Sequence, residues 1–409
     1  MSRAAGRALI AGFGRARLAH PPLPPAAAAV PALLESSVMA PQRWGGGWGD
    51  SLVLRDARHG KGLAGCCRGY AAGHIGTRSG GRGRGGGRGG GGGGGGAAGL
   101  NDEITGARSV EDILGLVESR GKGFDFIHVA NAMNKLVMKG PRSKDGRELE
   151  GKRLRLDPRF AQLIDLVRLH CHKFKERAIA NVLHALAVFQ ADLDAVTIDE
   201  RLAAQLGAIA EREARKMNEQ NVANTLNALS KLEAVATTVS SSGWAELAQA
   251  AGRMAREMNP QGVANTLNAL SKLEAATAAV TPMGWAGLAQ AVERTARRMT
   301  SQDVANTLNA LNKLEAAEAA VSPPGWAGLA EAAERTAREM NPHNVANTLN
   351  ALTKLEAAAA AVSPPGWAGL AQAAERTARG MNPQDVANTL NALGNDRSAY
   401  TLITESSVT

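Results

Sequence analysis

Polar side chains that can bind nucleic acid recur at a fixed spacing in the 409-residue sequence. Gln220, Asn224, Asn227 and Lys231 are 4, 3 and 4 residues apart, which places them on one face of an α-helix. The same stripe recurs as Gln261, Asn265, Asn268 and Lys272, as Gln302, Asn306, Asn309 and Lys313, and as His343, Asn347, Asn350 and Lys354. Carboxamides can pair with base edges, and ammonium groups can meet phosphates. The asparagines and lysines of this stripe therefore predict a track for single-stranded RNA.

The asparagines also have a structural interpretation. Amides between packed helices often satisfy backbone groups, so Asn224 and its equivalents fit a structural role as well as a binding role. We expect Asn227 and its equivalents to be the more accessible to a ligand. The stripe thus predicts two asparagine positions per repeat with different exposure.

The stripe lies within a strict sequence repeat. Val-Ala-Asn-Thr-Leu-Asn-Ala-Leu begins at Val222, Val263, Val304, Val345 and Val386, each 41 residues after the last. A constant period of this length is typical of a stack of one supersecondary unit, and such stacks present extended binding surfaces. We therefore look for function on a repeated face and not in a unique pocket.

One unit, residues 322–352, shows the elements that must position the stripe. Ser322 followed by two prolines predicts a helix start, and Asn341 with Pro342 predicts a second start within a short turn. The first helix has an apolar stripe at helical spacing, formed by Trp326, Leu329, Ala333, Ala337 and Met340. The second helix has another, formed by Val345, Leu349, Leu352 and Leu355. Each unit is predicted to be a hairpin of two antiparallel helices.

Tryptophans recur once per regular unit, at Trp244, Trp285, Trp326 and Trp367. An exposed ring could stack on a base, but each tryptophan lies on the apolar stripe of its first helix. Buried aromatic rings dominate packing energy, so we interpret all four as core anchors.

The predicted fold class is all-α, an α-solenoid superhelix of helix-turn-helix repeats with a disordered N-terminal segment. Less regular second-helix cores at 129–134 and 179–184 bring the number of these cores to seven and are expected to cap the N-terminal end. We divide the chain into a leader and Gly/Arg-rich tail (1–100), degenerate repeats (101–200), regular repeats (201–394) and a polar tail (395–409). The last second helix is expected to have little to cover it.

Charge separates the first hundred residues from the rest. They contain 13 basic and 3 acidic residues, whereas residues 101–409 have a net charge of −1. Arginines without acidic neighbours before Glu35 are typical of an organellar transit peptide, so we predict a chloroplast location, with the mitochondrion as the alternative. Residues 79–96, mostly glycine with arginines, are predicted to be disordered, and a linker role is favoured over weak RNA binding.

The sequence offers no support for catalysis or for a metal site. Three cysteines are too few for a disulfide framework, and His170-Cys171-His172 is interpreted as ordinary helix surface. No Gly-Lys-Ser or Gly-Lys-Thr closes the glycine run, and no apolar run is long enough to span a membrane. We therefore predict no enzyme activity, cofactor, metal, membrane span or small-molecule substrate.

A family resemblance adds to this interpretation. The string Met-Asn-Pro-Gln-Asp-Val-Ala-Asn-Thr-Leu-Asn-Ala-Leu at 381–393, with Pro-Pro-Gly-Trp at 364–367, resembles the octotricopeptide repeat of green-algal organelle proteins. The resemblance covers about residues 122–394 and implies helical hairpin repeats that bind organellar transcripts. The 41-residue unit is longer than that family's unit, so the alanine-rich joint is interpreted as a local insertion. Asn227 and its equivalents stand where relatives often have tryptophan.

Two functions remain open at this point. The first is an organellar RNA-binding protein that controls translation, stability or processing of a chloroplast transcript, with single-stranded RNA and other protein factors as partners. The alternative is a protein–protein interaction scaffold of armadillo-like type, in which the amide ladder holds an extended peptide. From residue 181 onward acidic residues outnumber basic ones by 23 to 18, which favours the scaffold, whereas the resemblance and the basic leader favour RNA.

Overall fold

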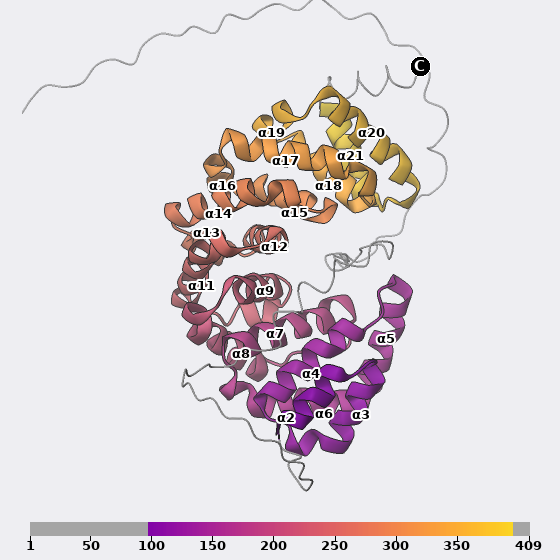
Figure 1. The fold of residues 1–409 in the computed structure, drawn as a ribbon, viewed down its shortest axis with the longest axis vertical. Coiled ribbons are helices and arrows are strands. Elements are labelled where there is room, and N and C mark those ends of the chain that lie inside the picture. Colours follow the sequence, from indigo (N-terminus) through magenta and orange to yellow (C-terminus); the bar gives the residue numbers. More distant parts are fainter. Residues whose placement is uncertain (1–96, 396–409) are drawn as a thin grey trace, which may run out of the picture. The chain divides into compact units, whose positions relative to one another are not determined.

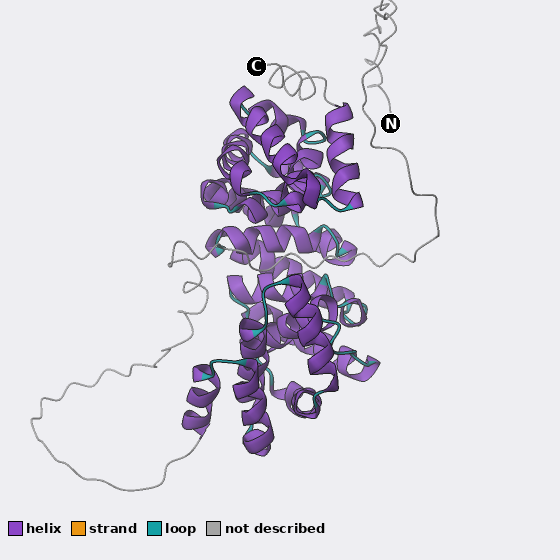
Figure 2. Ribbon diagram, turned by 90° about the vertical axis from the view of Figure 1, so that its right-hand side faces the viewer, coloured by secondary structure: helices purple, strands orange, loops and turns teal. Residues whose placement is uncertain are grey.

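The computed structural model describes residues 97–395, and within that range it contains twenty α-helices and no β-strand (Figures 1 and 2). The all-α solenoid class is confirmed. The assigned leader and polar tail lie outside the described residues, apart from 97–100 and Asn395. Residues 97–100 belong to helix α2, Ala97–Gly106, so the helical region begins slightly earlier than predicted.

A regular unit contains three helices. In the fourth unit these are the first helix α17, Pro323–Thr336, the second helix α18, Pro342–Leu352, and a short helix α19, Glu356–Ala361. The other first helices are α8 Glu200–Glu213, α11 Ser241–Met254, α14 Pro282–Thr295 and α20 Pro364–Thr377. The other second helices are α9 Glu219–Leu229, α12 Pro260–Leu270, α15 Ser301–Leu311 and α21 Pro383–Asn395. The remaining short helices are α10 Glu233–Ala236, α13 Glu274–Ala279 and α16 Glu315–Ala320.

The predicted hairpin of two helices is therefore present in each unit, but the prediction missed the short third helix. The alanine-rich joint is not an irregular insertion, because its glutamate and run of alanines form a helix after Leu232, Leu273, Leu314 or Leu355. Alanine has the highest helix propensity, and one alanine of each complete short helix, such as Ala317 or Ala358, is fully buried. The short helix packs back onto the first helix of its own unit.

Side-chain caps define the helix starts as the sequence predicts. Ser322 Oγ accepts a hydrogen bond from Gly325 N at 3.2 Å, and Asn341 Oδ1 accepts one from Asn344 N at 2.8 Å. In the third unit, Thr300 and Asp303 complete a reciprocal capping box at the start of α15. Each cap satisfies an N–H that has no partner within its helix, which fixes where the chain turns.

Neighbouring units stack helix against equivalent helix. Second helices pack side by side from α9 through α21, and first helices pack side by side from α8 through α20 (Figure 1). Both predicted apolar stripes of the fourth unit are buried, with every member at 6 % exposure or less. The core is thus continuous between units, and no unit buries its apolar faces alone.

An arginine of each first helix links its unit to the unit before. The Nη2 group of Arg335 donates to the carbonyl of Met299 at 2.8 Å, and Arg294 and Arg376 make equivalent bonds to Met258 and Met340. The acceptors follow the 3-10 turn that ends the preceding first helix, where carbonyl groups lack helical partners. A cation there also interacts favourably with the helix dipole, so the contact joins the stack electrostatically.

Irregular units precede the regular ones. They comprise α3 Val110–Arg120, α4 Phe126–Lys139, α5 Lys144–Leu156, α6 Pro158–His170 and α7 Glu176–Ala187, followed by a π-helical turn at Val188–Asp192. The cores at 129–134 and 179–184 lie in α4 and α7, and these helices continue the row of second helices into α9. The predicted seven second-helix cores are therefore confirmed. Helix α2 packs on α4 and covers the N-terminal side of the row.

Candidate nucleic-acid interface

The predicted site residues come together along the second helices. We call Asn224, Asn227 and Lys231, with their equivalents in the next three units, the amide–lysine row. Because α9, α12, α15 and α18 pack side by side, equivalent positions of adjacent units are neighbours. Electrostatic interactions between Lys231 and Lys272, and between Lys313 and Lys354, follow the same order. The row is therefore continuous across the four units.

The two asparagine positions differ in exposure, in the opposite sense to the prediction. Asn227 and Asn268 are only 5 % exposed, whereas Asn224 and Asn265 are half-buried. In the last unit, Asn391 is exposed, although its equivalent Asn350 in the preceding unit is buried. The following second helix therefore buries this position. The sequence could not indicate this, because helical periodicity does not specify which neighbour covers an edge.

Six amides of the row have no protein partner. Within residues 97–395, no side-chain hydrogen bond is made by the asparagine pairs of the first three regular units, Asn224/Asn227, Asn265/Asn268 and Asn306/Asn309, which we call the open amide pairs. Buried carboxamides normally find partners, because an unsatisfied one costs free energy. Three of these amides, Asn227, Asn268 and Asn309, are more than nine-tenths buried. They remain available to a ligand or to water.

The fourth and fifth units break this pattern. Asn347 is 2.9 Å from His343 Nε2, and His343 Nδ1 lies 3.0 Å from Asp385 in the last unit. With the Nδ1–H tautomer the imidazole donates to Asp385 and accepts from Asn347. In the last unit, Gln384 donates to Asn388 at 3.0 Å. The amide that is free in the first three units is therefore engaged in these two.

The lysines are not equivalent either. The Nζ atom of Lys231 lies 3.6 Å from Asp192 Oδ1, and both side chains are largely buried, at 11 % and 6 % exposure. Lys231 is therefore less accessible to a phosphate than the spacing of the stripe predicts, because a carboxylate already pairs with it. Asp192 lies at the end of the π-helical turn, an element that the sequence did not indicate. By contrast, Lys313 and Lys354 are exposed and form no ion pair among the described residues.

Burial and mutual repulsion destabilise the charged form of the central lysines. The ammonium group of Lys272 is partly desolvated between neighbouring second helices. This burial, together with Lys231 and Lys313, lowers the pKa of Lys272 to about 8. Burial and Lys354 likewise lower the pKa of Lys313. An anion bound along the row would relieve this repulsion.

His184 is a further row residue that the site prediction missed. Aligning 179–184 with 222–227 places Asn181 at the Asn224 position and His184 at the Asn227 position. Burial and the nearby Lys231 lower the pKa of His184 to about 4, so the ring is neutral at neutral pH. Asn181 is 4 % exposed. The alignment of the irregular core with the regular ones was the signal that could have identified both.

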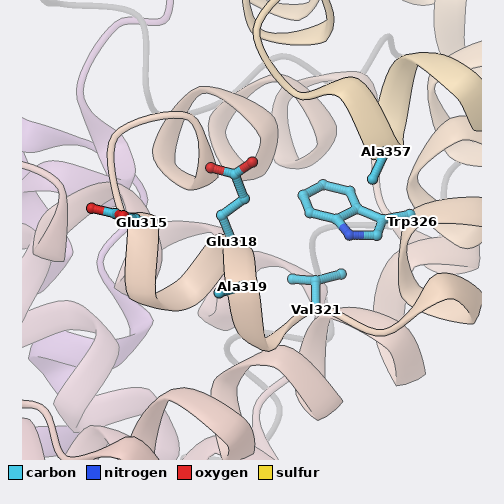
Figure 3. Close-up of a pocket in the computed structure, with 6 residues that line it drawn as sticks. All are labelled: Glu315, Glu318, Ala319, Val321, Trp326 and Ala357. Atoms are coloured by element: carbon cyan, nitrogen blue, oxygen red, sulfur yellow. The ribbon is translucent and has the colours of Figure 1, made fainter. Parts of the chain in front are cut away.

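The tryptophans are placed for packing. Trp244, Trp285 and Trp326 are each 6 % exposed, as predicted for core anchors, whereas Trp367 in the last unit is only partly buried. The edge of Trp326 faces a hollow formed with Val321 and Ala357, and the carboxylates of Glu315 and Glu318 line the same hollow (Figure 3). An acidic hollow would repel phosphate, so this ring is poorly placed to stack on a nucleic-acid base.

Three expectations about other features can be compared with the structure of residues 97–395. Cys171 is buried in the core, so the His170-Cys171-His172 stretch is not simply helix surface as predicted. Residues 97–395 contain no group of three potential metal ligands. None of the helices in that range combines the length and apolar character needed to cross a membrane.

Comparison with known proteins identifies the repeat but no activity. Five segments match a family described as Protein of unknown function (DUF1601), at residues 197–226, 245–267, 287–308, 328–349 and 369–390. Each segment covers most of a first helix and ends within the following second helix. No curated protein matches the chain. The similarity thus marks the same five hairpins as the sequence period.

Proposed function

We propose that the chain is an organellar single-stranded RNA-binding protein that acts on a chloroplast transcript after transcription, in translation, stability or processing. The observation that carries the proposal is the amide–lysine row, in which six amides without a protein hydrogen bond lie on three successive second helices and the exposed Lys313 and Lys354 form no ion pair among the described residues. Other helical repeat proteins read one base per repeat with two or three side chains. The two amides and one lysine of each unit are a set of that size.

The lysines of the amide–lysine row favour a polyanion over a peptide as the ligand. Lys313 lies close enough to Lys272, and Lys354 close enough to Lys313, to lower the affinity of Lys272 and of Lys313 for protons. A phosphate chain would offset this repulsion, whereas an uncharged peptide backbone would not. The Gly/Arg-rich segment and the leader add positive charge, although both lie outside the described residues.

The alternative is an armadillo-like scaffold for an extended peptide. The recessed position of Asn227 and its equivalents favours it, because buried amides can pair with a peptide backbone without any requirement for charge. The acidic excess after residue 181 points the same way. Under this alternative, removing the lysines would leave binding of the peptide unchanged.

Binding to a random single-stranded RNA pool tests the proposal. Replacing Lys272, Lys313 and Lys354 together by Gln should weaken binding and lower the salt slope by up to about 2, which is about 0.7 per phosphate contact. Arg256, Arg338 and Arg379 changed to Gln form the matched control, because they remove the same charge at one repeated position among the 3-10 turns. Unchanged RNA affinity in the folded lysine variant would refute the proposal and favour the scaffold.

The chloroplast location is tested separately. A reporter fused after residues 1–100 should enter chloroplasts, because the arginines of the leader lack acidic neighbours. Entry into mitochondria would support the alternative organelle. A cytosolic reporter would contradict the organellar part of the proposal and leave RNA binding to be judged on its own.

A further inference from the structure

The open amide pairs present the same two side chains in three successive units, although the adjacent Lys231 of the first unit is ion-paired with Asp192. In each, the first asparagine is half-buried, and the second is between 5 % and 7 % exposed. The residues that surround each pair on its helix are the same Val-Ala, Thr-Leu and Ala-Leu. Glutamine stands one turn before each pair, at Gln220, Gln261 and Gln302.

Identical surroundings have a consequence for specificity. A carboxamide offers one acceptor and two donors, and it can pair with the edge of any base when suitably oriented. The base that binds best to one open amide pair must therefore also bind best to the other two. Discrimination between bases cannot change from unit to unit where the side chains and their burial do not change.

Both flanks of the open pairs are different. On the N-terminal side the equivalent pair is Asn181 and His184, in which a neutral imidazole replaces the second amide. On the C-terminal side Asn347 is held by His343 at 2.9 Å. The equivalence therefore extends over three units and ends on each side at a histidine.

We infer that the three open amide pairs bind a single-stranded RNA tract of three identical nucleotides, one nucleotide for each pair. The inference rests on the proposed RNA-binding function and specifies its ligand. The nine-tenths-buried, unpartnered second amide of each pair reads the edge of the inserted base, and the first amide reads it from the more open side. The histidine-containing units on either side accept other nucleotides.

The test measures affinity for oligonucleotides of one length and one mixed flanking sequence, whose central triplet is AAA, CCC, GGG or UUU, or is mixed. One homotriplet should bind most tightly. Replacing its middle nucleotide should weaken binding by about 5- to 100-fold, the range for one lost base contact. Mixed triplets that bind as tightly as every homotriplet would overturn the inference while leaving RNA binding intact. Failure to bind any RNA would instead refute the proposed function.

A single substitution locates the contact. Asn268→Ala should abolish discrimination at the middle nucleotide only and leave discrimination at the two outer nucleotides. Its unfolding free energy should not fall, because no protein hydrogen bond is lost. Asn312→Ser is the matched control, since Asn312 lies outside the row and serine occupies the equivalent position in the first two units. Unchanged discrimination at the middle nucleotide in the folded Asn268→Ala chain would overturn the assignment.

Discussion

The fourth and fifth regular units have almost the same sequence but different surroundings. Val345 and Leu349 of α18 are 0 % and 2 % exposed, whereas their equivalents in α21, Val386 and Leu390, are 40 % and 64 % exposed. The difference arises because α21 packs on α18 but has no described second helix after it. The burial of a residue in this protein therefore depends on the neighbouring unit as much as on its own helix.

The tryptophans of the first helices show the same dependence of burial on neighbouring elements. Trp326 is covered by the short helix α19, whose Ala357 lies beside the ring (Figure 3). Trp367 has no described short helix after its unit and is only partly buried. A tryptophan in the same local sequence is thus buried in one unit and only partly buried in the next.

Trp326→Ala should have the largest effect. Truncating a buried aromatic ring removes its transfer free energy and leaves a cavity, at a cost of about 3–5 kcal/mol. Trp367→Ala, the matched change in the last unit, should cost less than half as much. Denaturant unfolding followed by circular dichroism measures both, with the whole transition compared because repeat arrays need not unfold in one step. Equal losses would show that the two rings share one environment.

Two lysines of the amide–lysine row differ in their surroundings in a similar way, since Lys231 is ion-paired and Lys354 is not. Lys231→Gln removes the ion pair of Lys231 with the largely buried carboxylate of Asp192, so the unfolding free energy should fall by about 3 kcal/mol. Lys354→Gln removes an exposed lysine without an ion pair among the described residues, and should change stability by less than about 0.5 kcal/mol. If Lys231→Gln is also neutral, the ion pair contributes nothing and Lys231 would again be available to an anion.

His184 lies in an irregular unit, at the position that Asn227 and its equivalents occupy in the regular units. Its pKa is lowered to about 4 in the folded chain, so between about pH 4 and pH 6.5 only the unfolded chain binds the proton. Stability should therefore fall as the pH decreases through this window. The loss should be about 2 kcal/mol, less than the full shift implies because the ring is only half-buried.

The matched variant is His184→Asn, which restores the residue found at this position in the regular units. The difference in unfolding free energy between parent and variant is measured at pH 6.5 and again at pH 4. The change in this difference isolates the contribution of the imidazole, because the carboxylates titrate in both chains. A difference that does not change with pH would show that the ring titrates normally in the folded chain.

The sequence by itself determined the repeat and most of its local structure. The period fixed the five units, serine, asparagine and threonine caps with prolines marked the helix starts, and the apolar stripes identified the buried faces. These features are local, because capping and helical periodicity depend on residues within about one or two turns. The alanine-rich joint carried the same kind of local information, since alanine favours helix, but the two-helix interpretation overlooked it.

Tertiary structure decided which residues of the polar stripe are accessible. Asn227 is buried by the following second helix, and Lys231 is neutralised by Asp192 from the π-helical turn. Neither contact follows from the spacing of the stripe, because each depends on a residue or helix outside the second helix itself. The bond between His343 and Asn347 does follow from that spacing, because the two residues are four apart on one helix. Periodicity assigns a residue to a face of its helix, but the neighbouring unit determines what remains of that face for a ligand.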